Sequence, residues 1–181
     1  MNNAEINSFQ INHLIKRQLR KESNLSLIER KQNGTFLTNQ VRVIDNIIDI
    51  VDVNSDLLRK KILEPSVGYG IILIRLLERI SQNFEINEIK QFIENNLFFV
   101  DIDAKMIETT EQNISEWFLA TFKEKYKGKF NSYCFDFTKK KQETNLFDLL
   151  EPNDYPLKEH ISSFDYILDR KSTRLNSSHY S

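Results

Sequence analysis

The sequence contains few of the residues from which disulfides and metal sites are built. Its single cysteine, Cys134, excludes an internal disulfide. Its three histidines are scattered and do not have the spacing of metal ligands. Because the chain has neither a signal peptide nor an apolar run near the length of a membrane span, we expect a cytoplasmic protein without a membrane partner.

Neither sign of charge dominates the sequence. The 25 basic and 26 acidic residues leave a net charge of -1, so the composition gives no overall signal for binding to a polyanion. A basic cluster near the amino terminus is typical of a solvated helix face. With 181 residues, the chain is long enough for one domain with a hydrophobic core. The basic cluster consists of Lys16, Arg17, Arg20, Lys21, Arg30 and Lys31.

The first part of the chain has the apolar spacing of helices. Residues 5–31 carry a broad apolar face at helical period, and the pattern ends at Asn33 and Gly34. After the segment GTFLTNQ, residues 34–40, the apolar residues again recur at helical spacing. We therefore expect an N-terminal helical segment over 1–33 and a second helix beginning near Val41. Its inward residues are predicted to be Val41, Ile44, Ile47, Ile48 and Val51.

The stretch ILEPSVGYG, residues 62–70, has the pattern of a strand followed by a glycine turn. A short apolar strand breaks at Glu64 and Pro65 into a turn that carries Gly68 and Gly70, and an apolar helical run follows over 71–80. Strand, glycine turn and helix in this order present backbone N–H groups to nucleotide-like ligands in α/β sheets. An ordinary strand-to-helix turn is the alternative interpretation.

Two residues argue against a pyrophosphate ligand at this turn. Leu73 replaces the third glycine of the dinucleotide-binding pattern GxGxxG, and the carboxylate of Glu64 would repel a pyrophosphate. A carboxylate tolerates a ligand with a cationic head, and S-adenosylmethionine carries both an ammonium and a sulfonium.

A second predicted strand, LFFVDID over 97–103, ends in two carboxylates. A helical stretch over 86–94 precedes it, and a long helix is expected from Ala104 to about Tyr126. Asp103 fits the N-cap of that helix. Asp101 lies at the carboxyl end of the strand, where a carboxylate can hold a ribose diol, and Ile102 would then lie against a base. The inward residues of the helix are predicted to be Ile107, Ile114, Phe118 and Phe122, and Trp117 is assigned to the core or the helix edge.

A third strand, FNSYCFDF over 130–137, is again followed by a polar turn. Asp136 could accept a hydrogen bond from an adenine amino group while Phe137 stacks on the ring. A strand-terminal aspartate beside a core phenylalanine is the alternative. A fourth strand is expected over 164–168.

Three successive strands thus end in a carboxylate, at Glu64, Asp101 and Asp136. The alternation of strands with helices predicts an α/β fold with a parallel sheet and right-handed crossovers. Like charges gathered at one sheet edge repel each other, so a ligand with cationic and hydrogen-bond-donor groups explains all three.

The sequence changes character after Leu168. Residues 169–179, DRKSTRLNSSH, match codon by codon the translation of a common short-read sequencing adapter. We therefore expect the natural sequence in this chain to end at about Leu168, and we exclude 169–181 from the fold prediction. A native tail is the alternative.

Residues 32–168 resemble the adenine-specific, amino-methylating DNA methyltransferases of restriction-modification systems. GTFLTN is similar to the G-x-[FY]-[FY]-T-P element of that family, with Asn39 in place of the usual proline. ILEPSVGYG is similar to the cofactor loop LEP-x-x-G-x-G, FFVDID resembles the ribose-binding strand, and CFDF matches the adenine-contacting element. FDYIL looks like the strand that leads into the catalytic [DNS]-P-P-[YFW] loop, at the point where the adapter translation begins.

The resemblance implies a Rossmann-like S-adenosylmethionine-dependent methyltransferase fold, present here as the cofactor-binding half over 34–168. It implies that Phe36 and Thr38 help bind the methionine part of the cofactor, that Asp101 binds the ribose, and that Asp136 and Phe137 contact adenine. No catalytic residue is assigned, because the catalytic loop and the target-recognition domain would follow Leu168. The implied cofactor-binding residues are Phe36, Thr38, Glu64, Pro65, Gly68, Gly70, Asp101, Ile102, Asp136 and Phe137.

The implied activity is methylation of the exocyclic amino group of adenine in double-stranded DNA, with a restriction endonuclease or a specificity subunit as a further partner. A methyltransferase acting on protein glutamine or on RNA is one alternative, and the GTFLTN element favours DNA over it. A non-catalytic DNA-binding subunit with the same fold is another, and the residues after Leu168 decide between it and the enzyme. A nicotinamide-dependent oxidoreductase is disfavoured by Leu73 and Glu64.

Overall fold

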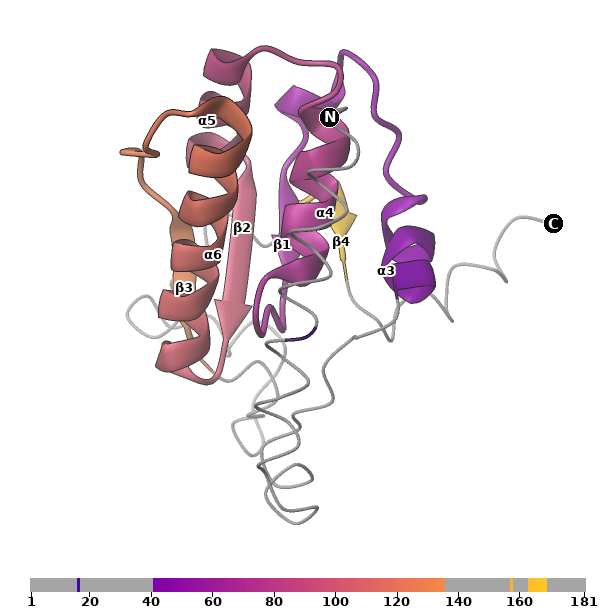
Figure 1. Ribbon diagram of the computed structural model, residues 1–181. Coiled ribbons are helices and arrows are strands. Elements are labelled where there is room, and N and C mark those ends of the chain that lie inside the picture. The colour runs from indigo at the N-terminus through magenta and orange to yellow at the C-terminus, as the bar shows by residue number, and fades with distance from the viewer. Residues whose placement is uncertain (1–15, 17–40, 136–156, 158–162, 169–181) are drawn as a thin grey trace, which may run out of the picture.

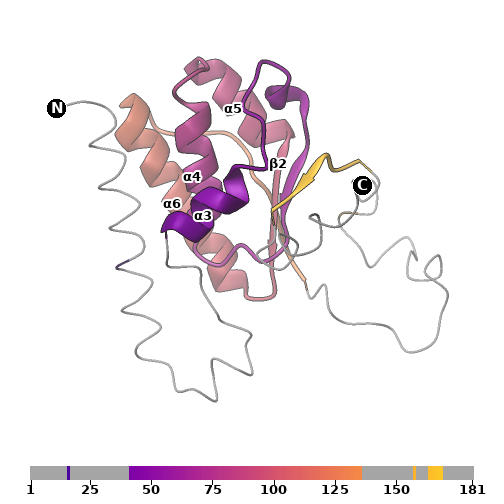
Figure 2. The same cartoon turned by 90° about the vertical axis from the view of Figure 1, so that its right-hand side faces the viewer.

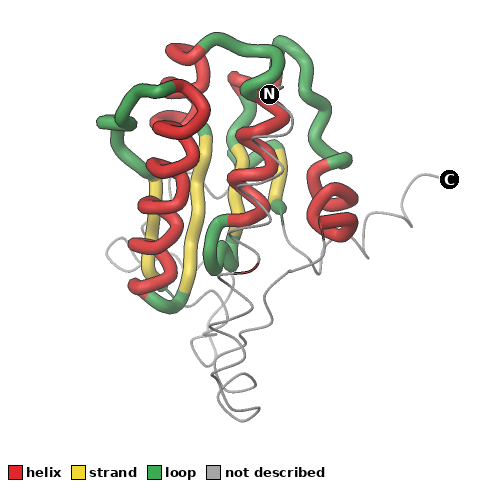
Figure 3. The backbone as a smooth tube through the Cα atoms, in the orientation of Figure 1, coloured by secondary structure: helices red, strands yellow, loops and turns green. Residues whose placement is uncertain are grey.

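The computed structural model describes residue 16, residues 41–135, residue 157 and residues 163–168. In this part of the chain, helices alternate with the strands of one parallel sheet (Figure 1, Figure 3). The α/β class and the parallel sheet predicted from the sequence are confirmed, and the architecture is compatible with a Rossmann-like fold. The predicted N-terminal segment and the tail 169–181 lie outside the described residues, apart from Lys16, which is helical and exposed.

The four described strands are arranged in the order β3-β2-β1-β4, and every neighbouring pair is parallel. From β1 the chain places β2 and β3 on one side and β4 on the other. The strand order therefore reverses between β1 and β4, and ligands of open α/β sheets bind outside the carboxyl ends of the strands at such a switch point. The strands are β1 (Ile62–Glu64), β2 (Leu97–Asp101), β3 (Asn131–Cys134) and β4 (Tyr166–Ile167).

The described helices cover one face of this sheet. In the side view of Figure 2, α3, α4 and α6 lie together on the same side of the strands. Helix α5 contacts β2, β3 and the short helix η1, and it leads directly into the amino end of β2. The helices are α3 (Val41–Ile48), η1 (Leu57–Arg59), α4 (Ile71–Ile80), α5 (Ile86–Asn95) and α6 (Ala104–Phe122).

The side chains of β2 divide the core into two layers, because successive residues of a strand point to opposite faces. Leu97 and Phe99 pack with the helices in the larger apolar cluster. Phe98 and Val100 belong to a second cluster on the other face, where Leu63 joins them. All five residues of β2 are buried, as expected for a strand inside a parallel sheet.

Helix α6 begins where the sequence predicts. The side chain of Asp103 accepts a hydrogen bond from the backbone N–H of Lys105, so the predicted N-cap is confirmed. The helix ends at Phe122 rather than near Tyr126, because Lys123 adopts a left-handed conformation with φ of 58°. Trp117 is buried in the core, and so are three of the four inward residues predicted for this helix, with Phe122 partly buried against them.

None of the helices in the described part of the chain combines the length and the apolar character that a membrane span requires.

Candidate functional site

The candidate site is the carboxyl edge of β1 and β2, beside the switch point. Between β1 and α4 the backbone turns through Gly68 and Gly70, whose φ angles are 55° and 73°. This is the left-handed region, in which residues with a side chain are strained. The two glycines singled out in the sequence are therefore needed for the shape of the turn.

Asp101 connects this turn to the end of β2. Its Oδ2 accepts a hydrogen bond from the backbone N–H of Gly68 at 2.9 Å, and its Oδ1 accepts one from the N–H of Asp103 at 3.0 Å. The residue is 9% exposed. A carboxylate offers about four acceptor positions, so these two bonds leave capacity for a ligand donor. The structure thus brings together Gly68 and Asp101, two residues predicted from separate motifs.

Helix α6 holds the same turn from the opposite side. The Thr110 hydroxyl donates to the carbonyl oxygen of Gly68 at 2.9 Å, and the Asn113 side-chain amide donates to the carbonyl oxygen of Tyr69 at 2.9 Å. Thr110 and Asn113 are 0% and 1% exposed. A Cβ atom added to Gly70 would lie 2.7 Å from Cγ2 of Thr110, so the turn packs directly against this helix.

Sequence reasoning did not identify Thr110 and Asn113. A signal for them is present, because two polar residues stand on the inward side of α6 next to the buried Ile107 and Ile114. A buried polar side chain needs a hydrogen-bond partner, and a partner outside the helix is required when the helix backbone is already satisfied. The identity of that partner depends on how α6 packs against a turn some forty positions away, which local sequence patterns do not specify.

An apolar surface lies next to Asp101. Ile102 is 59% exposed, a high value for a large apolar side chain. Cys134 is exposed at the end of β3, opposite Asp101 in the strand register, and its Sγ lies 3.5 Å from the carbonyl oxygen of Ile102. An exposed apolar side chain beside a carboxylate can contact a flat ring whose sugar the carboxylate binds.

The other predicted site residues lie either at the end of β1 or outside the described residues. Glu64 is the last residue of β1 and is 3% exposed, and Pro65 is half-buried at the start of the turn. The contact of Glu64 with a cationic ligand group stays a prediction. Four predicted contacts lie outside the described residues, namely Phe36, Thr38, Asp136 and Phe137.

The comparisons with known proteins add no family assignment. No protein-family model matches the chain, and the search of curated proteins gave no significant match.

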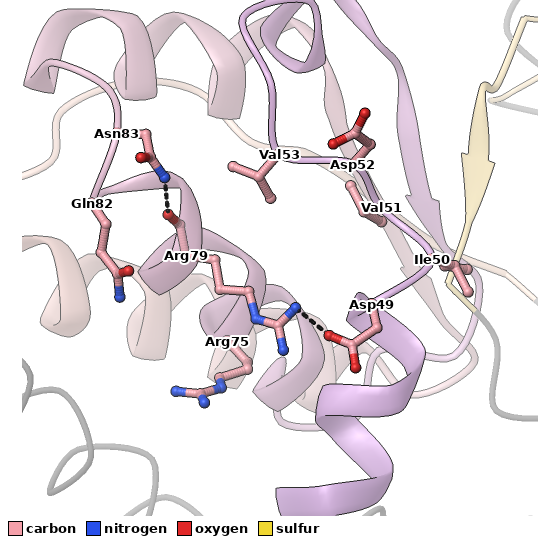
Figure 4. Close-up of a pocket in the computed structure, with 9 residues that line it drawn as sticks. All are labelled: Asp49, Ile50, Val51, Asp52, Val53, Arg75, Arg79, Gln82 and Asn83. Atoms are coloured by element: carbon pink, nitrogen blue, oxygen red, sulfur yellow. Dashed lines mark hydrogen bonds and ion pairs between the residues drawn. The ribbon is translucent and has the colours of Figure 1, made fainter.

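A cavity of about 670 Å³ lies elsewhere, between the loop after α3 and the second half of α4 (Figure 4). Two arginines of α4, Arg75 and Arg79, line it, and Asp49 and Asp52 lie across from them. The glycine turn precedes the first residue of α4, whereas the cavity borders the later turns of the helix. This cavity is therefore separate from the candidate site.

The arginines beside this cavity are held by carboxylates. Arg75 Nε lies 2.7 Å from Asp45 Oδ1, and Arg79 Nη1 lies 2.6 Å from Asp49 Oδ1. Arg75 also binds Glu78, whose Oε2 lies 3.0 Å from its Nη1. The pairs with Asp45 and Asp49 connect α3 and the turn after it to α4, and all three carboxylates occupy the guanidinium groups that an anionic ligand would need.

Glu78 makes the stability of this connection sensitive to pH. Burial raises the pKa of the Glu78 carboxyl to about 7, and the hydrogen bond from Arg75 opposes the rise. In the unfolded chain the carboxyl titrates near its ordinary value, so between pH 4.5 and 7 the folded protein binds a proton that the unfolded chain releases. Stability therefore falls as the pH rises through this window.

We expect the Glu78→Gln variant to lose this part of the pH dependence. Between pH 5 and 7.5 the free energy of unfolding of the wild type should fall relative to the variant, by on the order of 1–3 kcal/mol. Urea denaturation of both proteins at several pH values measures the difference. Glu108→Gln, at an exposed position of α6, is the matched control and should follow the wild type. Parallel profiles for wild type and Glu78→Gln would contradict the prediction.

Proposed function

We propose that this protein binds S-adenosylmethionine at the carboxyl edge of β1 and β2, and that it belongs to the enzymes that methylate the exocyclic amino group of adenine in DNA. The observation that carries the proposal is the position of Asp101. Its carboxylate ends β2, lies beside the switch point and contacts the glycine turn through the N–H of Gly68. A carboxylate in this position suits the two hydroxyls of a ribose.

The residues around Asp101 fit the rest of that cofactor. Exposed Ile102 offers an apolar contact for the adenine ring, and Gly68 presents its backbone without a Cβ atom. The cofactor supplies an electrophilic methyl group on its sulfonium. The chain's own contribution at this edge is to bind and orient the nucleoside part.

The environment of Leu73 supports this ligand over a dinucleotide. The third glycine of a dinucleotide site permits close packing of helix and strand. In this protein Leu73 is fully buried in α4 and fills that space with a side chain. The choice of DNA adenine as the methyl acceptor, and of a restriction endonuclease or specificity subunit as partner, rests on the sequence resemblance.

Isothermal titration calorimetry of the purified chain tests the cofactor. We expect binding of S-adenosylmethionine and of its demethylated product, S-adenosylhomocysteine, and no binding of NAD. Both methyltransferase ligands share the ribose and adenine that Asp101 and Ile102 are proposed to contact. Binding of NAD, or of none of the three ligands, would refute the proposal.

Methyl transfer is tested separately. The chain ending at Ser181 should transfer no methyl group to duplex DNA, because the resemblance places the catalytic loop after Leu168. A protein continued beyond Leu168 with sequence from genomic DNA should methylate adenine, measured as labelled N6-methyladenine after digestion of the DNA. RNA and a glutamine-containing protein substrate are the controls for the alternative acceptors. Methylation of DNA by the chain ending at Ser181 would show that this placement of the catalytic loop is wrong.

A further inference from the structure

We propose that Thr110 and Asn113 are positioning residues, which hold the glycine turn in the conformation that binds the ligand. The inference rests on the proposed function, since the ligand in question is S-adenosylmethionine. It concerns residues of α6 that lie behind the turn and do not themselves form the exposed edge of the site.

The backbone of Gly68 is held from two directions. Its N–H donates to Asp101 Oδ2 on β2, and its carbonyl oxygen accepts from the Thr110 hydroxyl on α6, each at 2.9 Å. The next carbonyl, that of Tyr69, accepts from the Asn113 amide at 2.9 Å. Both donors are buried, so water does not compete for these bonds.

These bonds determine which groups of the backbone face the ligand. In a planar trans peptide the C=O and the N–H point in opposite directions. Because the carbonyls of Gly68 and Tyr69 are directed toward α6, neither oxygen is directed toward the edge of the sheet. A carbonyl oxygen at that edge would repel the carboxylate of the cofactor. The two donors on α6 thus keep the turn from exposing its acceptors to the ligand.

The side chain of Thr110 also limits the space around the turn. Its Cγ2 methyl would lie 2.7 Å from a Cβ atom on Gly70, and its Oγ1 would lie 3.2 Å from the same atom. One side chain therefore provides both a hydrogen bond to Gly68 and a packing contact with Gly70. Serine retains the hydroxyl and removes the methyl, whereas valine retains the shape and removes the hydroxyl.

The test compares these two substitutions by their effect on ligand affinity. Thr110→Val should weaken S-adenosylmethionine binding by roughly five- to thirtyfold, because the Gly68 carbonyl loses its buried donor and the turn must be ordered when the ligand binds. Thr110→Ser should remain within about threefold of the wild type. Affinity is measured by calorimetry, with fluorescence of the single tryptophan, Trp117 on the same helix, as a second readout.

Controls separate positioning from general stability. Thr109→Val is the matched variant, because the Thr109 hydroxyl donates to the Lys105 carbonyl within its own helix, and its affinity should equal that of the wild type. All titrations are made at a temperature at which circular dichroism shows each variant folded. If Thr110→Val does not fold, Thr110→Ala provides the hydroxyl-free protein for the same comparison with serine.

The possible results have distinct meanings. Binding by the wild type with equal affinity in Thr110→Val would overturn the positioning role and leave the proposed function intact. Equal weakening by serine and valine would overturn it too, because serine keeps the hydroxyl, so the loss of affinity would not follow the hydrogen bond to Gly68. Absence of binding by the wild type would overturn the proposed function itself.

Discussion

Replacing Asp101 by alanine is expected to lower the affinity for S-adenosylmethionine about ten- to a hundredfold. Charge-assisted hydrogen bonds from the ribose hydroxyls to the carboxylate each contribute roughly 1.5–3 kcal/mol, and alanine provides no acceptor. The substitution also removes the acceptor of the Gly68 N–H, so the turn loses one of its buried bonds. Calorimetric titration of the variant measures the change.

Two further variants separate these effects. Asp101→Asn keeps an acceptor oxygen for Gly68 but loses the charge, so it should be nearly as stable as the wild type while its affinity stays low. Asp103→Ala removes a carboxylate two positions along the chain, which caps α6. It should cost about 1 kcal/mol of stability and leave the affinity unchanged. Unchanged affinity in Asp101→Ala would remove Asp101 from the site.

Replacing Gly70 by alanine is expected to lower the free energy of unfolding by about 2–4 kcal/mol. The left-handed φ of 73° strains a residue that has a Cβ atom, and that atom would overlap Cγ2 of Thr110 at 2.7 Å. Since Gly70 belongs to the proposed site and Thr110 is proposed to position its turn, cofactor affinity should fall with stability. Chemical denaturation of the variant gives the stability change.

The overlap can be tested apart from the backbone strain. In a Thr110→Ser background the methyl group is absent, so Gly70→Ala should cost about 1–2 kcal/mol less than it does in the wild type. The strain of the left-handed conformation remains in both backgrounds. Equal costs in the two backgrounds would show that the turn moves away from α6 and that the contact is not a constraint.

Features that depend only on residues close together in the sequence were predictable. The apolar run 71–80 predicts a helix, and α4 occupies Ile71–Ile80. Strands were also expected over 61–64 and 97–103, because their apolar residues suit burial on both faces of a parallel sheet, and β1 and β2 lie there, although β2 ends at Asp101. Asp103 was predicted as an N-cap from its position before Ala104, and its side chain has that role.

The lengths of the outer strands were overestimated for a physical reason. The pattern over 130–137 is that of a strand, whereas among the described residues β3 covers Asn131–Cys134 and leaves out Phe130 and Phe135. Its last partner is Asp101, where β2 ends, and a strand edge without a neighbour makes no ladder. Likewise β4 is limited to two residues by the short β1. Strand length is a property of the pair, whereas the sequence pattern describes one member.

The candidate site was predictable only in part. Asp101 and Gly68 belong to strand ends, and parallel strands bring their carboxyl ends to one edge whatever the details of packing. Thr110 and Asn113 contact the turn because of how α6 is rotated about its axis and how closely it packs against the sheet. The packing of the whole core sets both. The Asp45 and Arg75 pair likewise depends on how α3 lies against α4.

The place of β4 in the sheet has a consequence for the order of folding. Ile62 pairs with Leu97 on one side and with Tyr166 on the other, and the adjacent bond from Lys61 to Asp165 spans 104 positions. Closing the long loop between β1 and β4 costs about 1 kcal/mol more in chain entropy than closing the shorter loop between β1 and β2. The two register pairs of β4 and the backbone bonds from Asp165 and Leu168 offset that cost, but pairings that are distant in sequence form slowly. During folding, β1 and β2 can therefore place the glycine turn beside Asp101 early, and the switch point is completed when β4 joins last.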